Sequence, residues 1–309
     1  MAQIKPLSAE LQKIACDELE EIPSRIPEDL ATLKLWIQQQ PHLQARTDDQ
    51  FLIQFLRGCK YSLEKAKAKI DHFHAMKTKY PQFFSPTNVD DVIFRECHNL
   101  GVLTPLPIPL NDNGPRILFY RFNYPTNKFS LEEIFLPINA MHEVLMISDA
   151  YAGIHGITYL VDLGKATASH FLHMSPGAIK RIMNFYEKSR PLRIRGICYI
   201  NASSVAEQFF KAVLSCLSEK LRERVAICGK DISKIYSHIP QKYLPQDYGG
   251  SNGCLQQLTA DYNKVWDEHR LYFKQNSEFG TNESLRPGKP LDFDDVLGIG
   301  GSFRKLNVD

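Results

Sequence analysis

The sequence predicts an α/β protein in which a helical N-terminal unit precedes a mainly parallel sheet. Over about the first ninety residues, apolar side chains recur at steps of three and four, the spacing of helices that bury one face. After them, β-type runs at 117–122, 156–163 and 193–201 alternate with helical patterns. Strands separated by helices imply crossover connections, which make neighbouring strands parallel.

The composition is that of an ordinary globular protein. Hydrophobic residues make up 43% and charged residues 23% of the 309 residues, enough for one large domain or two small ones. Lysine and arginine number 37 against 35 acidic residues, so we expect no nucleic-acid partner. The N-terminus lacks the apolar core of a signal peptide, and no uncharged apolar run approaches the ~18 residues that span a bilayer. Seven cysteines without a CxxC pair predict reduced thiols in a cytoplasmic monomer.

The N-terminal unit shows three successive helix signals. Pro27 opens a segment that Pro41 stops, and its apolar side chains share one face. Asp48 or Asp49 is placed to cap the next helix, which ends at Gly58. Ser62 starts a third helix that runs to about residue 80.

The strands are joined by further helices. One is expected at 130–151, and another from Ser175 and Pro176, as N-cap and first residue, through 188. A helix at 204–217 precedes a second that starts at Ser218, and the region 256–279 is helical again. The tail from Glu283 is rich in Gly, Pro and Asp, which predicts a loop on the surface.

The helix at 204–217 is apolar over most of its circumference. Its polar residues form one narrow stripe from Ser204 to Ser218. Such a helix cannot lie on a surface with one face in water. It is either a buried crossover helix or a lid, with one face closing an apolar cavity and the other meeting a membrane.

Positive charge is concentrated next to this helix. The segment 180–230 holds eleven basic and four acidic residues, a charge of +7 on a chain of +2. Arg193 and Arg195 are two apart on a strand, and Lys220 and Arg224 four apart on a helix, so each pair shares a face. The four cations either bind a phosphorylated headgroup or form a solvated face with Glu219 and Glu223 as partners.

Signals for catalysis and metal binding are weak. No GxSxG, P-loop or GxGxxG motif occurs. His72 and His74 are two apart on a helix and cannot share a metal, and His170 and His173 lack a third ligand. We therefore expect no enzyme activity, no metal and no cofactor. Asp162 ends a strand, as a catalytic carboxylate of an α/β enzyme would, but the family resemblance described next implies a structural role for it.

Five ordered blocks of sequence resemble the CRAL-TRIO family of lipid-binding proteins. They are FLRGCKYSLEKAK (55–67), YLVDLGKATASHF (159–171), PLRIRGICYIN (191–201), LSEKLRERV (217–225) and LPQDYGG (244–250). The tail GIGGSFRKL (298–306) is similar to insect members. The resemblance implies a three-helix N-terminal unit at 1–95, an α/β lipid-binding domain at 96–255 and a C-terminal helix and tail at 256–309. It also implies a cavity closed by a mobile helical gate at about 201–224.

The resemblance also assigns residues to two sites. The cations beside the gate fall on positions that hold a phosphoinositide headgroup in the family, namely Arg193, Arg195, Lys220 and Arg224. A fifth family arginine falls on Cys59, next to Lys60, which makes phosphoinositide selectivity less certain than basic headgroup binding. The gate residues are Val205, Phe209 and Val213. The cavity positions are Phe135, His142, Ile157, Tyr159, Val161, Ile182, Phe185, Leu192 and Ile197.

The resemblance implies a carrier of tocopherols, retinoids, carotenoids or related isoprenoid lipids that docks transiently at anionic membranes. His142 sits in an apolar helical stretch and is either a core histidine or a hydrogen-bonding partner of the ligand. A lipid-regulated adaptor that keeps its ligand is the alternative. An α/β enzyme with an apolar substrate would need a nucleophile and a base, and the sequence shows no such constellation.

Overall fold

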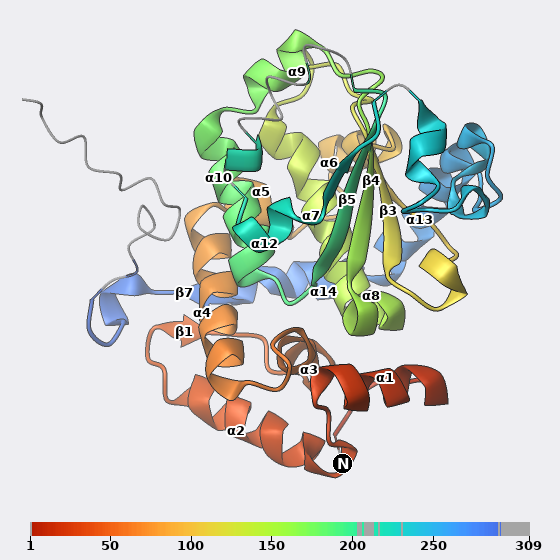
Figure 1. The fold of residues 1–309 in the computed structure, drawn as a ribbon. Helices are drawn as coiled ribbons and strands as arrows, with labels where there is room; N and C mark the ends of the chain where they lie inside the picture. The colour runs from red at the N-terminus through yellow and green to blue at the C-terminus, as the bar shows by residue number, and fades with distance from the viewer. Residues whose placement is uncertain are drawn as a thin grey trace, which may run out of the picture.

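A five-stranded sheet with helices on both faces forms the centre of the molecule (Figure 1). The computed structural model describes residues 2–202, 206, 213–215, 217–229, 231–289 and 291. Strand β2 is antiparallel to β3, whereas β3, β4, β5 and β6 are parallel, which confirms the predicted fold class. The strands are β2 (Leu103–Pro105), β3 (Arg116–Arg121), β4 (Ile157–Asp162), β5 (Ile194–Ile200) and β6 (Val225–Ile227).

The N-terminal part is helical, as the spacing of apolar residues predicts. The three predicted helices are α2 (Ile26–Gln38), α3 (Asp49–Gly58) and α4 (Leu63–Lys79). Asp48 caps α3, because its side chain accepts a hydrogen bond of 3.0 Å from the backbone N–H of Phe51. The sequence analysis did not name the helices around these three, which are α1 (Ala9–Leu19), α5 (Pro81–Phe84) and α6 (Val92–Asn99).

The helices between the strands begin close to their predicted starts but end earlier. Ser130 forms a capping box with Glu133 at the start of α7 (Leu131–Ser148). Asp149 then caps the separate helix α8 (Ala150–His155). Between β4 and β5 lie α9 (Ala168–His173) and α10 (Pro176–Asn184), and α10 runs into one wider π turn over Phe185–Ser189.

Strand β4 is buried along its whole length and separates two cores. Leu160 packs on one face with Phe119 and Ile200, under the segment from Cys228 to Leu255. Tyr159 and Val161 alternate with Leu160 and face the opposite core, which α7 and α10 cover (Figure 1). The second core contains the cavity described below.

The C-terminal segment returns to the N-terminal helices. After α13 (Leu255–Glu268) and α14 (Arg270–Gln275), strand β7 (Gly280–Thr281) pairs antiparallel with β1 (Leu43–Gln44). Arg286 follows in the predicted loop, where it pairs with Asp71 of α4 through hydrogen bonds that include one of 2.8 Å. Short α12 (Glu219–Arg222) precedes β6. Within the part of the chain that the structure describes, no helix has the length and apolar character needed to cross a membrane.

Candidate ligand cavity and basic cleft

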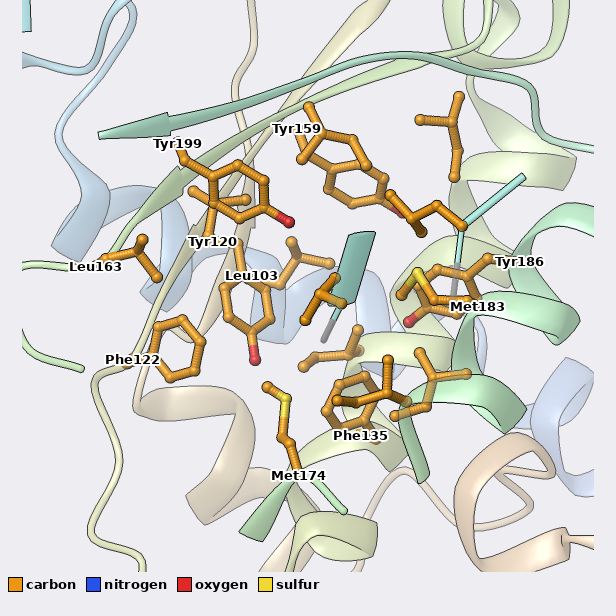
Figure 2. Close-up of a pocket in the computed structure, with 18 of the residues that line it drawn as sticks. Leu103, Tyr120, Phe122, Phe135, Tyr159, Leu163, Met174, Met183, Tyr186 and Tyr199 are labelled. Atoms are coloured by element: carbon orange, nitrogen blue, oxygen red, sulfur yellow. The ribbon is translucent and has the colours of Figure 1, made fainter. Parts of the chain in front are cut away.

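An apolar cavity lies between the sheet and the helices α7 and α10 (Figure 2). The space open to the centres of water molecules is about 120 Å³, roughly ten times what one water needs. Rings of Tyr120, Tyr159 and Tyr199 project from three neighbouring strands toward Tyr186 and Met183 of the helical wall (Figure 2). A space of this kind, with apolar walls and a few polar groups, is typical of a small-molecule site.

Six of the nine predicted cavity positions line this space. They are Phe135, His142, Tyr159, Val161, Ile182 and Ile197. The alternation expected for β4 accounts for two of them, because Tyr159 and Val161 point to the same face of the sheet.

The other three positions are buried but do not line the cavity. Phe185 stacks on Phe84, with ring centroids 4.1 Å apart, and on Phe73 at 5.7 Å, so it packs against the N-terminal helices. Leu192 lies before β5 and borders the cleft described below. Ile157, the first residue of β4, is packed into the core with no exposed surface.

His142 is not the isolated polar group that the sequence suggested. Its Nδ1–H donates to the carbonyl of Ile138 at 2.7 Å, which leaves Nε2 to accept from the hydroxyl of Tyr159 at 2.6 Å. Burial, with the charge of Arg190 as a second cause, holds the pKa of His142 well below its usual range. The imidazole is therefore neutral, and a ligand that binds it must displace one of these partners.

Helical and strand periodicity would have identified most of the remaining wall. Ile179, Ile182, Met183 and Tyr186 follow one another at steps of three, one and three, which keeps them on one side of a helix. Tyr120 with Phe122 and Ile197 with Tyr199 are pairs two residues apart on strands. Further lining residues are Leu103, Ile138, Leu163, Met174, Ile194, Val213 and Leu217.

A cleft rich in positive charge lies beside the cavity. About 860 Å³ of it is open to the centres of water molecules, and its walls carry nine lysines and arginines but two glutamates. All four predicted headgroup residues line it, together with Cys59 and Lys60. The sequence analysis missed the other cations, which are Lys65, Lys69, Lys188 and Arg190.

Two of the predicted cations are held in place by backbone carbonyls. Arg193 donates to the carbonyl of Ile154, and Arg224 donates to that of Ile194. Arg195 is exposed and lies 3.7 Å from the carboxylate of Glu18. Arg224 lies beyond the single turn of α12 instead of on a helix with Lys220, but both still face the cleft. Burial lowers the pKa of Arg193 to about 10.

The cavity and the cleft share a wall. Tyr186 and Ile194 line both. Of the predicted gate residues, Val213 borders the cavity, whereas Val205 and Phe209 lie outside the described residues. The carboxylate of Asp162 accepts hydrogen bonds from the backbone N–H of Gly164 at 2.8 Å, from the side chain of Asn201 at 2.7 Å and from the hydroxyl of Tyr248.

This combination of an α/β sheet and an apolar cavity agrees with the comparison to known families. The CRAL/TRIO domain model matches residues 110–250, and the model of a Pinta-like UBA domain matches residues 22–93. Residues 110–250 of the chain therefore match a CRAL/TRIO domain. Proteins with this domain bind and transport hydrophobic ligands and are in general not enzymes.

The chain is similar to curated relatives over most of its length. The chain is 27% identical to mouse "Alpha-tocopherol transfer protein-like" over 266 residues, which is 84% of this chain and 74% of the relative. It is 23% identical to human "Clavesin-2" over 79% of this chain and 75% of that protein. The crystal structure of Sfh5 aligns at a TM-score of 0.48 and 13% identity, over 86% of this chain and 100% of that one.

Proposed function

We propose that the protein carries an isoprenoid-like lipid, of the tocopherol, retinoid or carotenoid class, through the cytosol and exchanges it at membranes that contain phosphoinositides. The observation that supports this most directly is the shared wall between an apolar cavity and a cleft with nine cationic side chains. The first suits a hydrophobic ligand and the second a phosphorylated headgroup.

The cleft favours multiply charged headgroups over a single negative charge. Arg193 and Arg224 are oriented by backbone carbonyls, so little side-chain entropy is lost when they bind phosphate. Cys59, at the family arginine position, is 8% exposed on the cleft wall. Lys60 on the same wall supplies a cation beside it, which supports headgroup binding without an arginine at position 59.

Ligand exchange requires two events in order, docking of the cleft at the membrane and then opening of the gate. Positive charge brings the cleft to an anionic membrane, an attraction that fades within a Debye length. The gate then inserts apolar side chains at the interface, for which the sequence offers Val205, Phe209 and Val213. Opening of the gate lets the ligand leave the cavity.

A charge-matched pair of variants tests this mechanism. Arg195→Ala with Lys220→Ala removes two exposed cations of the cleft. Each contributes roughly 1 kcal/mol near an anionic surface, so binding to phosphoinositide vesicles at low salt should weaken about thirtyfold. The control, Lys128→Ala with Lys242→Ala, removes two exposed cations that do not line the cleft.

The measurements are vesicle binding and the rate of ligand transfer to anionic and neutral vesicles. We expect the cleft variant to slow transfer to anionic vesicles, to leave transfer to neutral vesicles and ligand binding in solution unchanged, and to differ from the control. Equal rates for wild type and cleft variant on phosphoinositide vesicles would refute the mechanism. Tight vesicle binding without ligand release would instead indicate the adaptor.

A further inference from the structure

Arg190 is a buried arginine that has no carboxylate partner among the described residues. Arg190 directly follows the π turn after α10, and it is 3% exposed. Its Nη2 donates to the hydroxyl of Tyr159 at 3.3 Å, and its guanidinium carbon lies 3.5 Å from the ring centroid of Tyr186. Nε and Nη1 find no hydrogen-bond partner in the described part of the chain.

A lone buried charge is costly, and an anion that reaches it is correspondingly stabilised. Arginine stays charged in proteins, so the cost cannot be avoided by loss of the proton. The ring face of Tyr186 and the phenol oxygen of Tyr159 compensate part of the positive charge of Arg190. Two nitrogens, which carry three N–H donors, are left without an acceptor; this is rare for buried polar groups and indicates a missing partner.

The guanidinium lies directly behind the cavity wall. Tyr159 and Tyr186, its two contacts, both line the cavity (Figure 2). Arg190 lines the cleft and is not among the residues that line the cavity, and its backbone carbonyl accepts from Lys69 at 3.1 Å. Its guanidinium nevertheless contacts two side chains of the cavity wall, and the neutral His142, which accepts from one of them, supplies no negative charge there.

We propose that Arg190 anchors an acidic head group, so that the preferred cavity ligand is a lipid with a carboxylate at one end. This inference rests on the proposed function and specifies its ligand. The carboxylate takes the place of Tyr159 on Nη2 or turns Tyr186 aside to reach Nη1, while the hydrocarbon part fills the apolar space. A planar carboxylate matches the paired donors of a guanidinium.

Chain-matched pairs of ligands test the proposal with the intact protein. We would measure dissociation constants for retinoic acid against retinol and for oleic acid against oleyl alcohol at pH 7.4. The wild type should bind each acid at least tenfold more tightly than its alcohol. Arg190→Gln should bring the two members of each pair to within about twofold, whereas Arg190→Lys should keep part of the preference.

Arg25→Gln is the control, because it removes an exposed arginine that lines neither the cavity nor the cleft, and its acid preference should equal that of wild type. Equal binding of acid and alcohol by the wild type overturns the proposal without any variant and leaves the proposed function intact. Displacement of the acids by inorganic phosphate also overturns it, because the anion site would then open to the cleft. Binding of neither member of either pair overturns the proposal, and the proposed function falls with it only if tocopherol and carotenoid also fail to bind.

Discussion

At the scale of single residues, the cavity wall is sensitive to side-chain volume. Val161 lines the cavity from the middle of the sheet. Val161→Trp places an indole in a space of about 120 Å³, and we expect at least a tenfold loss of affinity for hydrophobic ligands because the two cannot occupy it together. Ligand titration measures the loss, and circular dichroism verifies that the fold is kept.

Leu172→Trp serves as the control for this variant. Leu172 is 82% exposed on α9, so the same indole there should leave the affinity unchanged. Wild-type affinity and stoichiometry in Val161→Trp for every ligand would show that the space does not hold the ligand.

Periodicity predicts which residues face inward where an element is regular, and fails where it is not. Tyr159 and Val161 follow the strict alternation of a strand. The resemblance placed Phe185 in the cavity, and the sequence predicted one continuous helix through 188. Residues 185–189 instead form a π turn, in which Tyr186 faces the cavity and Phe185 stacks on Phe84.

Contacts between segments far apart in sequence are the second reason why the sequence predicted only part of the cavity and the cleft. Lys65 and Lys69 are four apart on α4, a visible signal of a shared face. Their place in the cleft depends on how α4 packs against the turn at Phe185–Ser189, more than a hundred residues later. Lys69 shows this contact, because its Nζ donates to the carbonyl of Glu187 at 2.8 Å.

At the scale of elements, a buried ion pair joins α4 to α7. Lys77 Nζ lies 2.7 Å from a carboxylate oxygen of Glu143, and both side chains are almost fully buried. Asn276, after α14, donates to the other oxygen at 3.1 Å. Three segments distant in sequence therefore meet at one carboxylate.

Lys77→Met should destabilise the fold by about 3–5 kcal/mol, because it leaves the Glu143 carboxylate buried without its cation. Lys77→Met with Glu143→Leu should cost less than the single change, because no unpaired charge is left. Urea unfolding measures both. A single variant within 1 kcal/mol of wild type, or a double variant less stable than the single one, would contradict this account.

At the scale of the whole molecule, three buried histidines make stability depend on pH. Burial lowers the pKa of His74 to about 3 and that of His98 to about 4, and it holds that of His142 well below its usual range. An unfolded histidine titrates near 6.5. Below that pH the unfolded chain takes up protons that the folded protein does not, so stability is full above 6.5 and falls as the pH falls.

At pH 5.5 each of these histidines should cost about 1.4 kcal/mol, or about 4 kcal/mol for the three. His74→Phe tests the contribution of one histidine to this loss of stability. The ring nitrogens of His74 have no hydrogen-bond partner in the described structure, and its ring packs against Phe73 with centroids 5.4 Å apart, so phenylalanine preserves the packing. Urea midpoints between pH 7.5 and 5.5 should show a shallower decline for the variant. An unchanged slope would mean that His74 is protonated in the folded state.

The wall that Tyr186 and Ile194 form between the cavity and the cleft has a thermodynamic consequence. If a bound headgroup changes the affinity for the cargo lipid by some factor, bound cargo must change the affinity for the headgroup by the same factor. A headgroup that loosens cargo tenfold, for instance, would make the emptied protein hold that headgroup ten times more tightly than the loaded one. After delivery the empty carrier would then stay on the membrane until new cargo enters, and loading itself would return it to the cytosol.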